Sequence, residues 1–494
     1  MRVLENLEPK DVFYYFEEIS RIPRPSYQEK AISDYLMSFA HEHHLEAYQD
    51  ELYNVIIIKE ATAGYEAEEP VILQGHMDMV CEKTGACQKD MEKEGLDLVV
   101  DGDYLSAEGT TLGGDDGIAV AYILAILSSD SIPHPRLECV ITVSEEVGMD
   151  GARGIDLSML KGHTLLNIDS EKEGELLTSC AGGGRVVATL PLIRETSPEA
   201  EAMLPVLVHV HGLIGGHSGI EIDKGRANAV HVLTGALRET YNAIPFRLIS
   251  MNNGGKDNAI PRDAKALVAI PGRSLNTFKE SLAASEKALR AEYIKADPDI
   301  TIDVLDAPEA LLAAPENQSV LSADSTKAVL TLISALPNGV QRMSDNIEGL
   351  VETSLNLGIV ETDAIRLTLH YALRSSVGSA YDTMARKMEW ICKALGAEVK
   401  RTGEYPAWEF KKESPLREKM VRVYKEMFGK DIDVVAVHAG VECGLLSGKI
   451  ENLDAVSIGP DMQDIHTPDE RLSISSAKRT YEYVLQVLAD RKGA

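Results

Sequence analysis

Short apolar runs alternate with long helical patterns along this chain, and this alternation constrains its fold most strongly. Strand-like runs occur at 53–58, 71–74 and 138–143, helical patterns fill 8–45, and a wholly apolar helix is expected at 117–129. Strands that alternate with helices predict an α/β domain with a mostly parallel sheet. In such sheets, ligands bind beyond the carboxyl ends of the strands.

The pattern changes near residue 186 and returns after about residue 402. Between these points, strands such as "PVLVHVHG" and "AIRLTLHYALRSS" alternate with amphipathic helices, which indicates a second α/β domain. A chain of 494 residues is also too long for one compact core. We therefore expect one domain from 1–187 and 403–494, with residues 188–402 inserted into it.

Charge and composition argue against several classes of partner. The formal net charge is −29, and the acids are spread along the chain, which disfavours nucleic acid and anionic membrane surfaces. No apolar run approaches the roughly 20 residues of a membrane helix, and the N-terminal stretch does not resemble a signal peptide. The six cysteines form no C-x-x-C pair and are expected to be reduced thiols. We expect a cytoplasmic protein.

Acids and histidines recur just after the apolar segments. "LQGHMDMV" places His76 and Asp78 at the end of a predicted strand. Four further segments also have an acid or a histidine just after an apolar run. These are "TTLGGDDG" with Asp115 and Asp116, "VITVSEEVG" with Glu145 and Glu146, "LLNIDSE" with Asp169, and "SIGPDMQDIHTPDE" with His466. Each alone has an ordinary explanation, such as a turn, a helix cap or a solvated helix start. Together they predict a metal-bearing cleft.

The residue types suit a centre with two metal ions. Two cations about 3.5–4 Å apart need a bridging carboxylate, terminal ligands and a free acid beside the reactive water. Zinc accepts such a mixed set of nitrogen and oxygen ligands. A ligating histidine also needs a group that fixes its second ring nitrogen, and His76-x-Asp78 has the spacing for it. One glutamate of the 145–146 pair can bind metal while the other serves as the base.

The sequence resembles the M20-type co-catalytic zinc metallopeptidases, and within them most closely the aminoacyl-histidine dipeptidases. The resemblance spans nearly the whole chain and rests on "GHMDMVCEK", "GGDDG", "SEEVGMDGA", "NIDSE", "GGHSG", "NAIPR", "HAGVECG" and "GPDMQDIHTPDE". It implies a phosphorylase/hydrolase-like zinc-peptidase catalytic domain with an inserted α/β lid domain. It also implies an enzyme that hydrolyses peptide bonds of unblocked dipeptides, preferentially Xaa-His.

The resemblance assigns a role to each residue of the cleft. Asp115 would bridge two zinc ions, for which Mn²⁺ or Co²⁺ could substitute. The remaining ligands would be His76 and Asp169 at one ion, and Glu146 and His466 at the other. Asp78 would orient His76, and Glu145 would be the general base.

One position departs from the family pattern. The family motif usually reads "GADNG", whereas this chain has "GGDDG" at 113–117. Asp116 would tighten metal binding or alter the metal preference if it faced the ions. We interpret it instead as a helix-start acid favoured by the helix dipole.

A dipeptidase must also recognise both ends of its substrate. Arg374 could bind the C-terminal carboxylate, Asn258 could add a hydrogen bond, and Glu442 could receive the free amine. By the resemblance, His217 of "GGHSG" would be a lid histidine that stabilises the oxyanion, in its own subunit or across a homodimer formed through the lid. Each residue could equally be an ordinary loop or strand-end residue.

Two other functions use the same ligands. An amidohydrolase of N-acylated amino acids or a tripeptidase would keep the metals and change the substrate. A metal-binding protein without catalysis is the third alternative, and the presence of Glu145 beside every expected ligand disfavours it.

Overall fold

The computed structural model describes residues 2–196, 203–253 and 255–491, which form two compact units. Unit 1 comprises Met1–Cys180, Phe410–Ala436 and Val441–Ala494, and unit 2 comprises Ala181–Glu409 and Val437–Gly440. Each unit has a hydrophobic core of its own. The insertion expected at 188–402 begins and ends inside unit 2.

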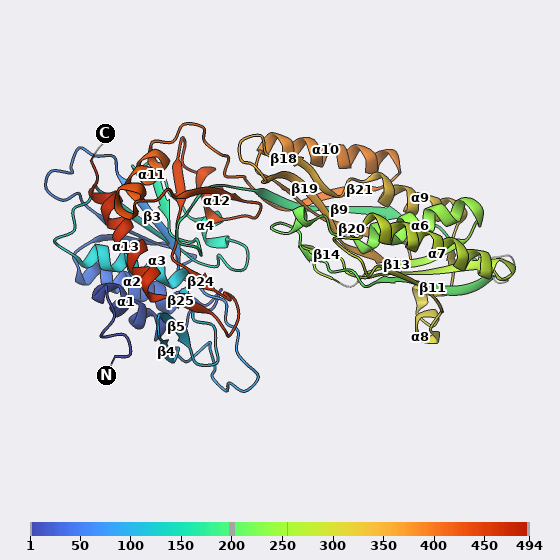
Figure 1. The fold of residues 1–494 in the computed structure, drawn as a ribbon, viewed down its shortest axis with the longest axis horizontal. Coiled ribbons are helices and arrows are strands. Elements are labelled where there is room, and N and C mark those ends of the chain that lie inside the picture. Colours follow the sequence, from blue (N-terminus) through green and yellow to red (C-terminus); the bar gives the residue numbers. More distant parts are fainter. Residues whose placement is uncertain (1, 197–202, 254, 492–494) are drawn as a thin grey trace. The chain divides into compact units, whose positions relative to one another are not determined.

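Unit 1 is built on an eight-stranded sheet (Figure 1). Its central strands are parallel: β3 pairs with β6 and β7, and β7 pairs with β23. Across the sheet the strands run β1 (Glu46–Gln49), β2 (Val55–Lys59), β6 (Leu137–Thr142), β3 (Val71–His76), β7 (Thr164–Asn167), β23 (Asp454–Ser457), β8 (Glu175–Cys180) and β22 (Asp433–Val437). This confirms the α/β class and places the carboxyl ends of β3, β6 and β7 at one edge.

Seven helices are assigned in the described part of unit 1. They are α1 (Lys10–Ser20), α2 (Lys30–Glu42), α3 (Gly114–Ser128), α4 (Asp150–Gly154), α11 (Pro415–Phe428), α12 (Glu442–Ser447) and α13 (Ile474–Ala489). A second sheet has the strand order β24 (Met462–Gln463), β25 (Arg471–Ser473), β5 (Tyr104–Ala107) and β4 (Leu98–Asp101). No helix of the described residues is long and apolar enough to cross a membrane.

Helix α3 is the element that brings acids to the edge of the large sheet. Every residue from Gly114 to Leu127 is buried, as expected for a helix that is apolar on all sides. The helix packs directly on β3 at Gly75, where a Cβ atom would lie 2.7 Å from Ala119 Cβ and would also collide with the Asp116 carboxylate. The glycine before His76 therefore allows the start of α3 to approach the strand end.

Unit 2 contains two antiparallel sheets. The first has the order β18 (Gly339–Met343), β19 (Val351–Thr362), β20 (Arg366–Ser375), β9 (Gly182–Pro191) and β21 (Glu398–Tyr405). The second has the order β13 (Arg247–Asn252), β15 (Ala264–Pro271), β11 (Met203–His211) and β16 (Thr301–Asp306). The helices are α6 (Ala229–Ala243), α7 (Leu275–Glu292), α8 (Glu309–Leu312), α9 (Ala323–Ala335) and α10 (Gly378–Ala394).

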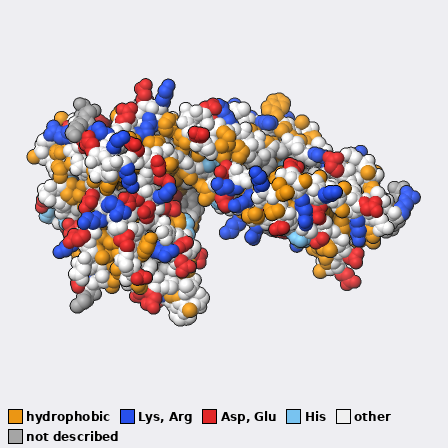
Figure 2. Space-filling model, in the orientation of Figure 1, with side chains coloured by type: hydrophobic (Ala, Val, Ile, Leu, Met, Phe, Trp, Pro, Cys, Tyr) orange, Lys and Arg blue, Asp and Glu red, His pale blue; other side chains and the backbone are white. Residues whose placement is uncertain are grey.

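Two short pairs complete unit 2, β10 (Arg194–Glu195) with β17 (Val320–Leu321) and β12 (Gly216–His217) with β14 (Ala259–Ile260). On the face shown in Figure 2, acidic and basic side chains are interspersed over each unit.

Candidate active site

The predicted histidine and acids meet at the carboxyl edge of the large sheet in unit 1. Strand β3 ends at His76, Glu145 and Glu146 follow β6, and Asp169 follows β7. His76 Nε2 lies 3.5 Å from Asp169 Oδ1, and both glutamates offer an oxygen within 4.8 Å of a His76 ring nitrogen. Because neighbouring parallel strands end at the same edge of the sheet, motifs that are separate in the sequence come together in one cluster.

Asp115 lies between two histidines. Its Oδ1 is 3.2 Å from His76 Nε2, while its Oδ2 is 3.2 Å from His466 Nε2. His466 also lies 2.9 Å from Glu146 Oε2. Hydrogen bonds with Asp115 and Glu146 raise the pKa of His466 to about 11. One carboxylate therefore presents its two oxygens to two separate groups of nitrogen and oxygen donors.

Asp78 fixes the orientation of His76. Its Oδ1 lies 3.4 Å from His76 Nδ1, so the ring points Nε2 toward Asp115. Asp78 also accepts a hydrogen bond from Ser26 Oγ at 2.8 Å and one from the Glu145 backbone N–H at 3.0 Å. Burial opposes ionisation of Asp78, but these hydrogen bonds and the His76 ring leave its pKa below the ordinary value. The same carboxylate thus contacts both the candidate metal ligand His76 and the candidate base Glu145.

Glu145 has the surroundings of a proton acceptor. Burial raises its pKa well above the ordinary value, and the negative charges of Asp169, Glu442 and Glu146 raise it further, against the opposing effect of His76. A carboxylate with a raised pKa can take a proton from water and release it again.

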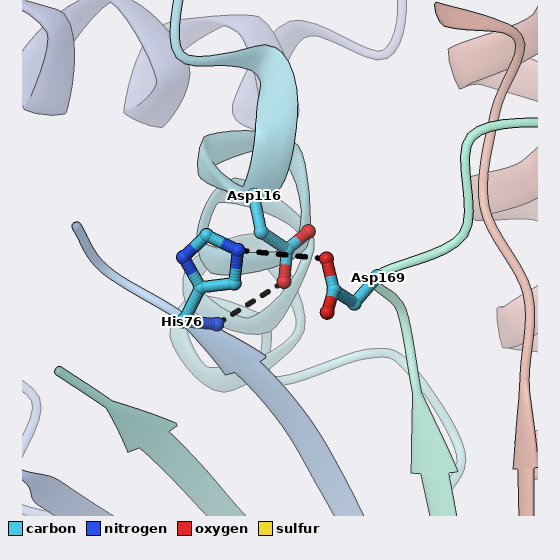
Figure 3. Close-up of side chains that lie close together, drawn as sticks. All are labelled: His76, Asp116 and Asp169. Atoms are coloured by element: carbon cyan, nitrogen blue, oxygen red, sulfur yellow. Dashed lines mark hydrogen bonds and ion pairs between the residues drawn. The ribbon is translucent and has the colours of Figure 1, made fainter. Parts of the chain in front are cut away.

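Asp116 lies in this cluster rather than at an exposed helix start. It is fully buried, and its Oδ2 accepts the His76 backbone N–H at 3.1 Å. Figure 3 shows Asp116 and Asp169 converging on His76. The backbone at Asp115 and Asp116 is not helical, with ψ values of 109° and 32°, which turns the second side chain toward β3. Asp116 is thus in the first turn of α3, as predicted, and in addition its side chain is part of the buried cluster.

The side chains fit divalent cations. Three groups each offer ligand atoms within 4.8 Å of one another: His76 with Asp116 and Asp169, His76 with Glu145 and Glu146, and Asp115 with Glu146 and His466. Burial raises the pKa of Asp169 to about 8 and that of Asp116 well above its ordinary value. Asp116 Oδ1 is also buried without a hydrogen-bond partner in the described structure. A cation would supply the positive charge that these crowded acids lack.

Two residues that sequence reasoning missed hold the loop before α3. Glu470 accepts backbone N–H groups from Leu112 at 2.8 Å, Gly113 at 3.0 Å and Gly114 at 2.8 Å. The buried guanidinium of Arg24 donates to the Met77 and Gly113 carbonyls. These contacts connect parts of the chain that are distant in sequence, and they involve backbone groups, so no local sequence motif predicts them.

Glu442 lies inside unit 1, close to the cluster. It is fully buried at the start of α12, and its Oε2 accepts hydrogen bonds from Gln74 at 2.5 Å and Thr142 at 2.7 Å. Its Oε1 has no hydrogen-bond partner among the described residues. Burial raises the pKa of Glu442 to about 7, against the opposing effect of His76.

The other predicted substrate residues belong to unit 2. Arg374 lies on β20, its Nη1 donates to the Tyr405 hydroxyl at 2.9 Å, and its buried Nε has no hydrogen-bond partner in the described structure. His217 is half-buried, and its pKa is lowered by burial and by the positive charge of Arg374. Asn258 is exposed, and its carbonyl accepts the Ser218 N–H at 2.8 Å. Unit 2 thus groups the His217 loop with the Asn258 loop.

Comparisons with known proteins identify the family. The family model described as "Peptidase family M20/M25/M40" matches residues 72–490. The cytosol non-specific dipeptidase of Escherichia coli (strain K12) is 35% identical over 490 residues, which cover 99% of both chains. The crystal structure of aminoacylhistidine dipeptidase from Vibrio alginolyticus superposes with a TM-score of 0.91 at 33% identity, covering 98% of this chain and 97% of that one.

A more distant structure shares the fold alone. Aminopeptidase PepT from Bacillus cereus gives a TM-score of 0.61 at 16% identity, with 98% of both chains covered. The resemblance inferred from the sequence motifs is confirmed by the family match and by the two full-length relatives. The chain therefore belongs to peptidase family M20/M25/M40 and is a hydrolase that acts on peptide bonds.

Proposed function

We propose that the chain is a dipeptidase with two metal ions that hydrolyses unblocked dipeptides, preferentially those with C-terminal histidine. The observation that carries the proposal is Asp115, whose two oxygens face two separate histidine–carboxylate groups beside Glu145. The names of two full-length relatives support dipeptides as the substrate class. The histidine preference rests on the name of the Vibrio alginolyticus relative and on the motifs.

His76, Asp115 and Asp169 would hold one ion, and Asp115, Glu146 and His466 the other. Zinc suits this mixed ligand set, and Mn²⁺ or Co²⁺ could replace it. Bound divalent cations lower the pKa of an attacking water and polarise the peptide carbonyl.

Side chains would transfer the proton, stabilise the developing negative charge and bind the two ends of the substrate. Glu145 accepts the proton of the attacking water and passes it to the departing amine. His217 donates a hydrogen bond to the carbonyl oxygen as negative charge develops there. Arg374 binds the C-terminal carboxylate, Asn258 adds a hydrogen bond, and the free oxygen of Glu442 receives the substrate ammonium. Holding both ends would restrict the enzyme to dipeptides.

Initial hydrolysis rates on one substrate panel test this proposal. Metal-stripped protein would be reconstituted with zinc, manganese or cobalt and assayed on Ala-His, β-Ala-His, Ala-Leu, N-acetyl-Ala-His and Ala-Ala-His. Metal-dependent cleavage of the free dipeptides, fastest with C-terminal histidine, is the expected result. Preferential cleavage of the acetylated peptide would instead support an acyl-amino-acid hydrolase, and preferential cleavage of Ala-Ala-His a tripeptidase. Bound metal without turnover would support a non-catalytic protein.

We also propose a cytosolic homodimer formed through unit 2. The name of the Escherichia coli relative supports the location, and the family resemblance supports the dimer. Light scattering after gel filtration would test the assembly, because a monomer has a mass of 53.8 kDa and a dimer twice that mass.

A further inference from the structure

The loop that carries His217 is built around the imidazole ring. His217 lies on the two-residue strand β12, which pairs with β14 so that His217 faces Ala259. Ring atom Nδ1 accepts two backbone hydrogen bonds, from Gly219 at 3.1 Å and from Ile220 at 3.2 Å. An imidazole nitrogen that accepts hydrogen bonds carries a lone pair and no proton. In the neutral ring, the proton must therefore be on Nε2.

The environment also favours the neutral ring. Burial lowers the pKa of His217, and the positive charge of Arg374 lowers it further, against a smaller opposing effect of Glu221. In the described part of the chain, Nε2 has no hydrogen-bond partner. The ring is thus prepared as a hydrogen-bond donor whose donor group remains available.

Glycines make this arrangement possible. A Cβ at Gly219 would lie 2.6 Å from the His438 carbonyl oxygen and 3.0 Å from Cε1 of the His217 ring. Gly216 has φ +144°, and a Cβ there would lie 2.8 Å from Glu221 Oε2 and would collide with the Arg226 guanidinium. Gly219 therefore allows the backbone amides to approach the His217 ring. Gly216 leaves room for the ion pair of Glu221 and Arg226 beside the backbone.

That ion pair holds the backbone at His217 itself and at Gly215, two residues earlier. Glu221 Oε2 accepts the His217 backbone N–H at 2.8 Å, and Glu221 Oε1 lies 2.9 Å from Arg226 Nη1. Arg226 Nη1 also donates to the Gly215 carbonyl. Glu221 and Arg226 are outside the set of residues that the substrate would contact, yet they hold both the strand and the turn that carry His217.

We propose that Glu221 and Arg226 are positioning residues that hold His217 as a neutral Nε2–H donor. His217 would thus act as a fixed hydrogen-bond donor and would not exchange protons during turnover. This inference deepens the proposed function and rests on its assignment of His217 to the substrate carbonyl oxygen. The tautomer itself is independent of that assignment.

The experiment uses the full chain labelled with ¹⁵N-histidine, because long-range ¹H–¹⁵N spectra distinguish the two neutral tautomers and the charged ring. His217→Ala assigns the signal. We expect wild-type His217 to be the Nε2–H tautomer at pH 7. In Glu221→Ala we expect a mixture of tautomers, and a kcat lowered by about tenfold with KM changed less, since losing an oxyanion donor outright costs about 10²–10³ in kcat. Glu221→Gln keeps an acceptor oxygen and should recover most of the activity.

Glu239→Ala serves as the control, because Glu239 is an exposed residue of α6 that pairs only with its neighbour Arg238 in the described structure. An Nδ1–H or charged ring in the wild type would overturn the inference, whatever the activity. An unchanged spectrum and unchanged kcat in Glu221→Ala would also overturn it. Full activity of His217→Ala alongside the expected tautomer would instead overturn the substrate contact in the proposed function, so the two failures are distinguishable.

Discussion

At the scale of single residues, the site depends on carboxylates that each serve more than one neighbour. Asp115 faces two histidines, and Asp78 contacts both a ring nitrogen of His76 and the backbone of Glu145. Removing one such group disturbs several others, so substitutions must be chosen to separate binding from chemistry.

Glu145→Gln separates them, because the amide keeps the size of the side chain but cannot accept the water proton. We expect kcat on Ala-His to fall by about 10²–10⁴-fold, with an unchanged metal content by mass spectrometry. Glu92→Gln changes an exposed glutamate and is the control. A kcat within a factor of a few of the wild type would exclude Glu145 as the base.

Asp78→Asn tests the orientation of His76. The amide is neutral and binds the ring less strongly than a carboxylate does, so we expect metal affinity to fall by about 10–100-fold in titrations against a chelator. Ser26→Ala removes only one hydrogen bond to Asp78 and should have a smaller effect. Equal affinities for wild type and Asp78→Asn would show that the carboxylate does not orient the ligand.

At the scale of elements, the start of α3 depends on a residue from a distant segment. Glu470 satisfies three backbone N–H groups between Leu112 and Gly114. The first N–H groups of a helix have no partner within it, and buried groups left unpaired are costly.

Glu470→Ala should therefore lower the free energy of unfolding by about 1–3 kcal/mol, measured by urea unfolding of the metal-loaded protein. Asp469→Ala, at the exposed neighbouring position, provides the comparison. Equal midpoints for the two variants would mean that solvent or a shifted loop replaces the lost acceptor.

Elements also show what the sequence could predict. His76 ends an apolar strand, and Glu145 and Asp169 come shortly after two others, so the geometry of a parallel sheet is enough to predict that they meet. Glu470 and Arg24 form hydrogen bonds with backbone groups that are distant in the sequence. Such contacts produce no periodic pattern of residues from which they could be predicted. Asp116 lies in the first turn of α3, as predicted, but its backbone is not helical there, and no sequence pattern predicts that its side chain turns inward to the His76 N–H.

At the scale of the whole molecule, buried histidines should make unit 2 less stable in acid. Unit 2 contains His231 and His438, and burial lowers the pKa of each to about 4. A histidine whose pKa is lower in the folded state takes up protons on unfolding between these values and about 6.5. Its contribution to stability is thus present above pH 6.5 and is lost as the pH falls toward 4.

We expect the calorimetric transition of unit 2 to move to lower temperature between pH 6.5 and pH 4. His231→Gln should reduce this dependence, and His163→Gln, at an exposed position of unit 1, should not. A transition of unit 2 that is independent of pH in this range would show that neither histidine remains neutral in the folded state.

The fold class follows from the alternation of strands and helices, but the full extent of unit 2 does not. Val437–Gly440 joins unit 2, where the carbonyls of Val437 and Ala439 accept the Ala181 N–H. So short a segment has no pattern of its own, because a few backbone hydrogen bonds decide where it belongs.

The division of unit 1 into three stretches of chain has a consequence for synthesis on the ribosome. Unit 2 is complete once residue 440 has emerged, whereas His466 and Glu470 belong to the stretch that follows. Because domains generally fold as they emerge, unit 2 can fold while the proposed metal centre still lacks His466. With the proposed ligand set, hydrolytic activity can arise only after that later stretch has left the ribosome, and a nascent chain stalled earlier would carry a folded unit 2 without His466.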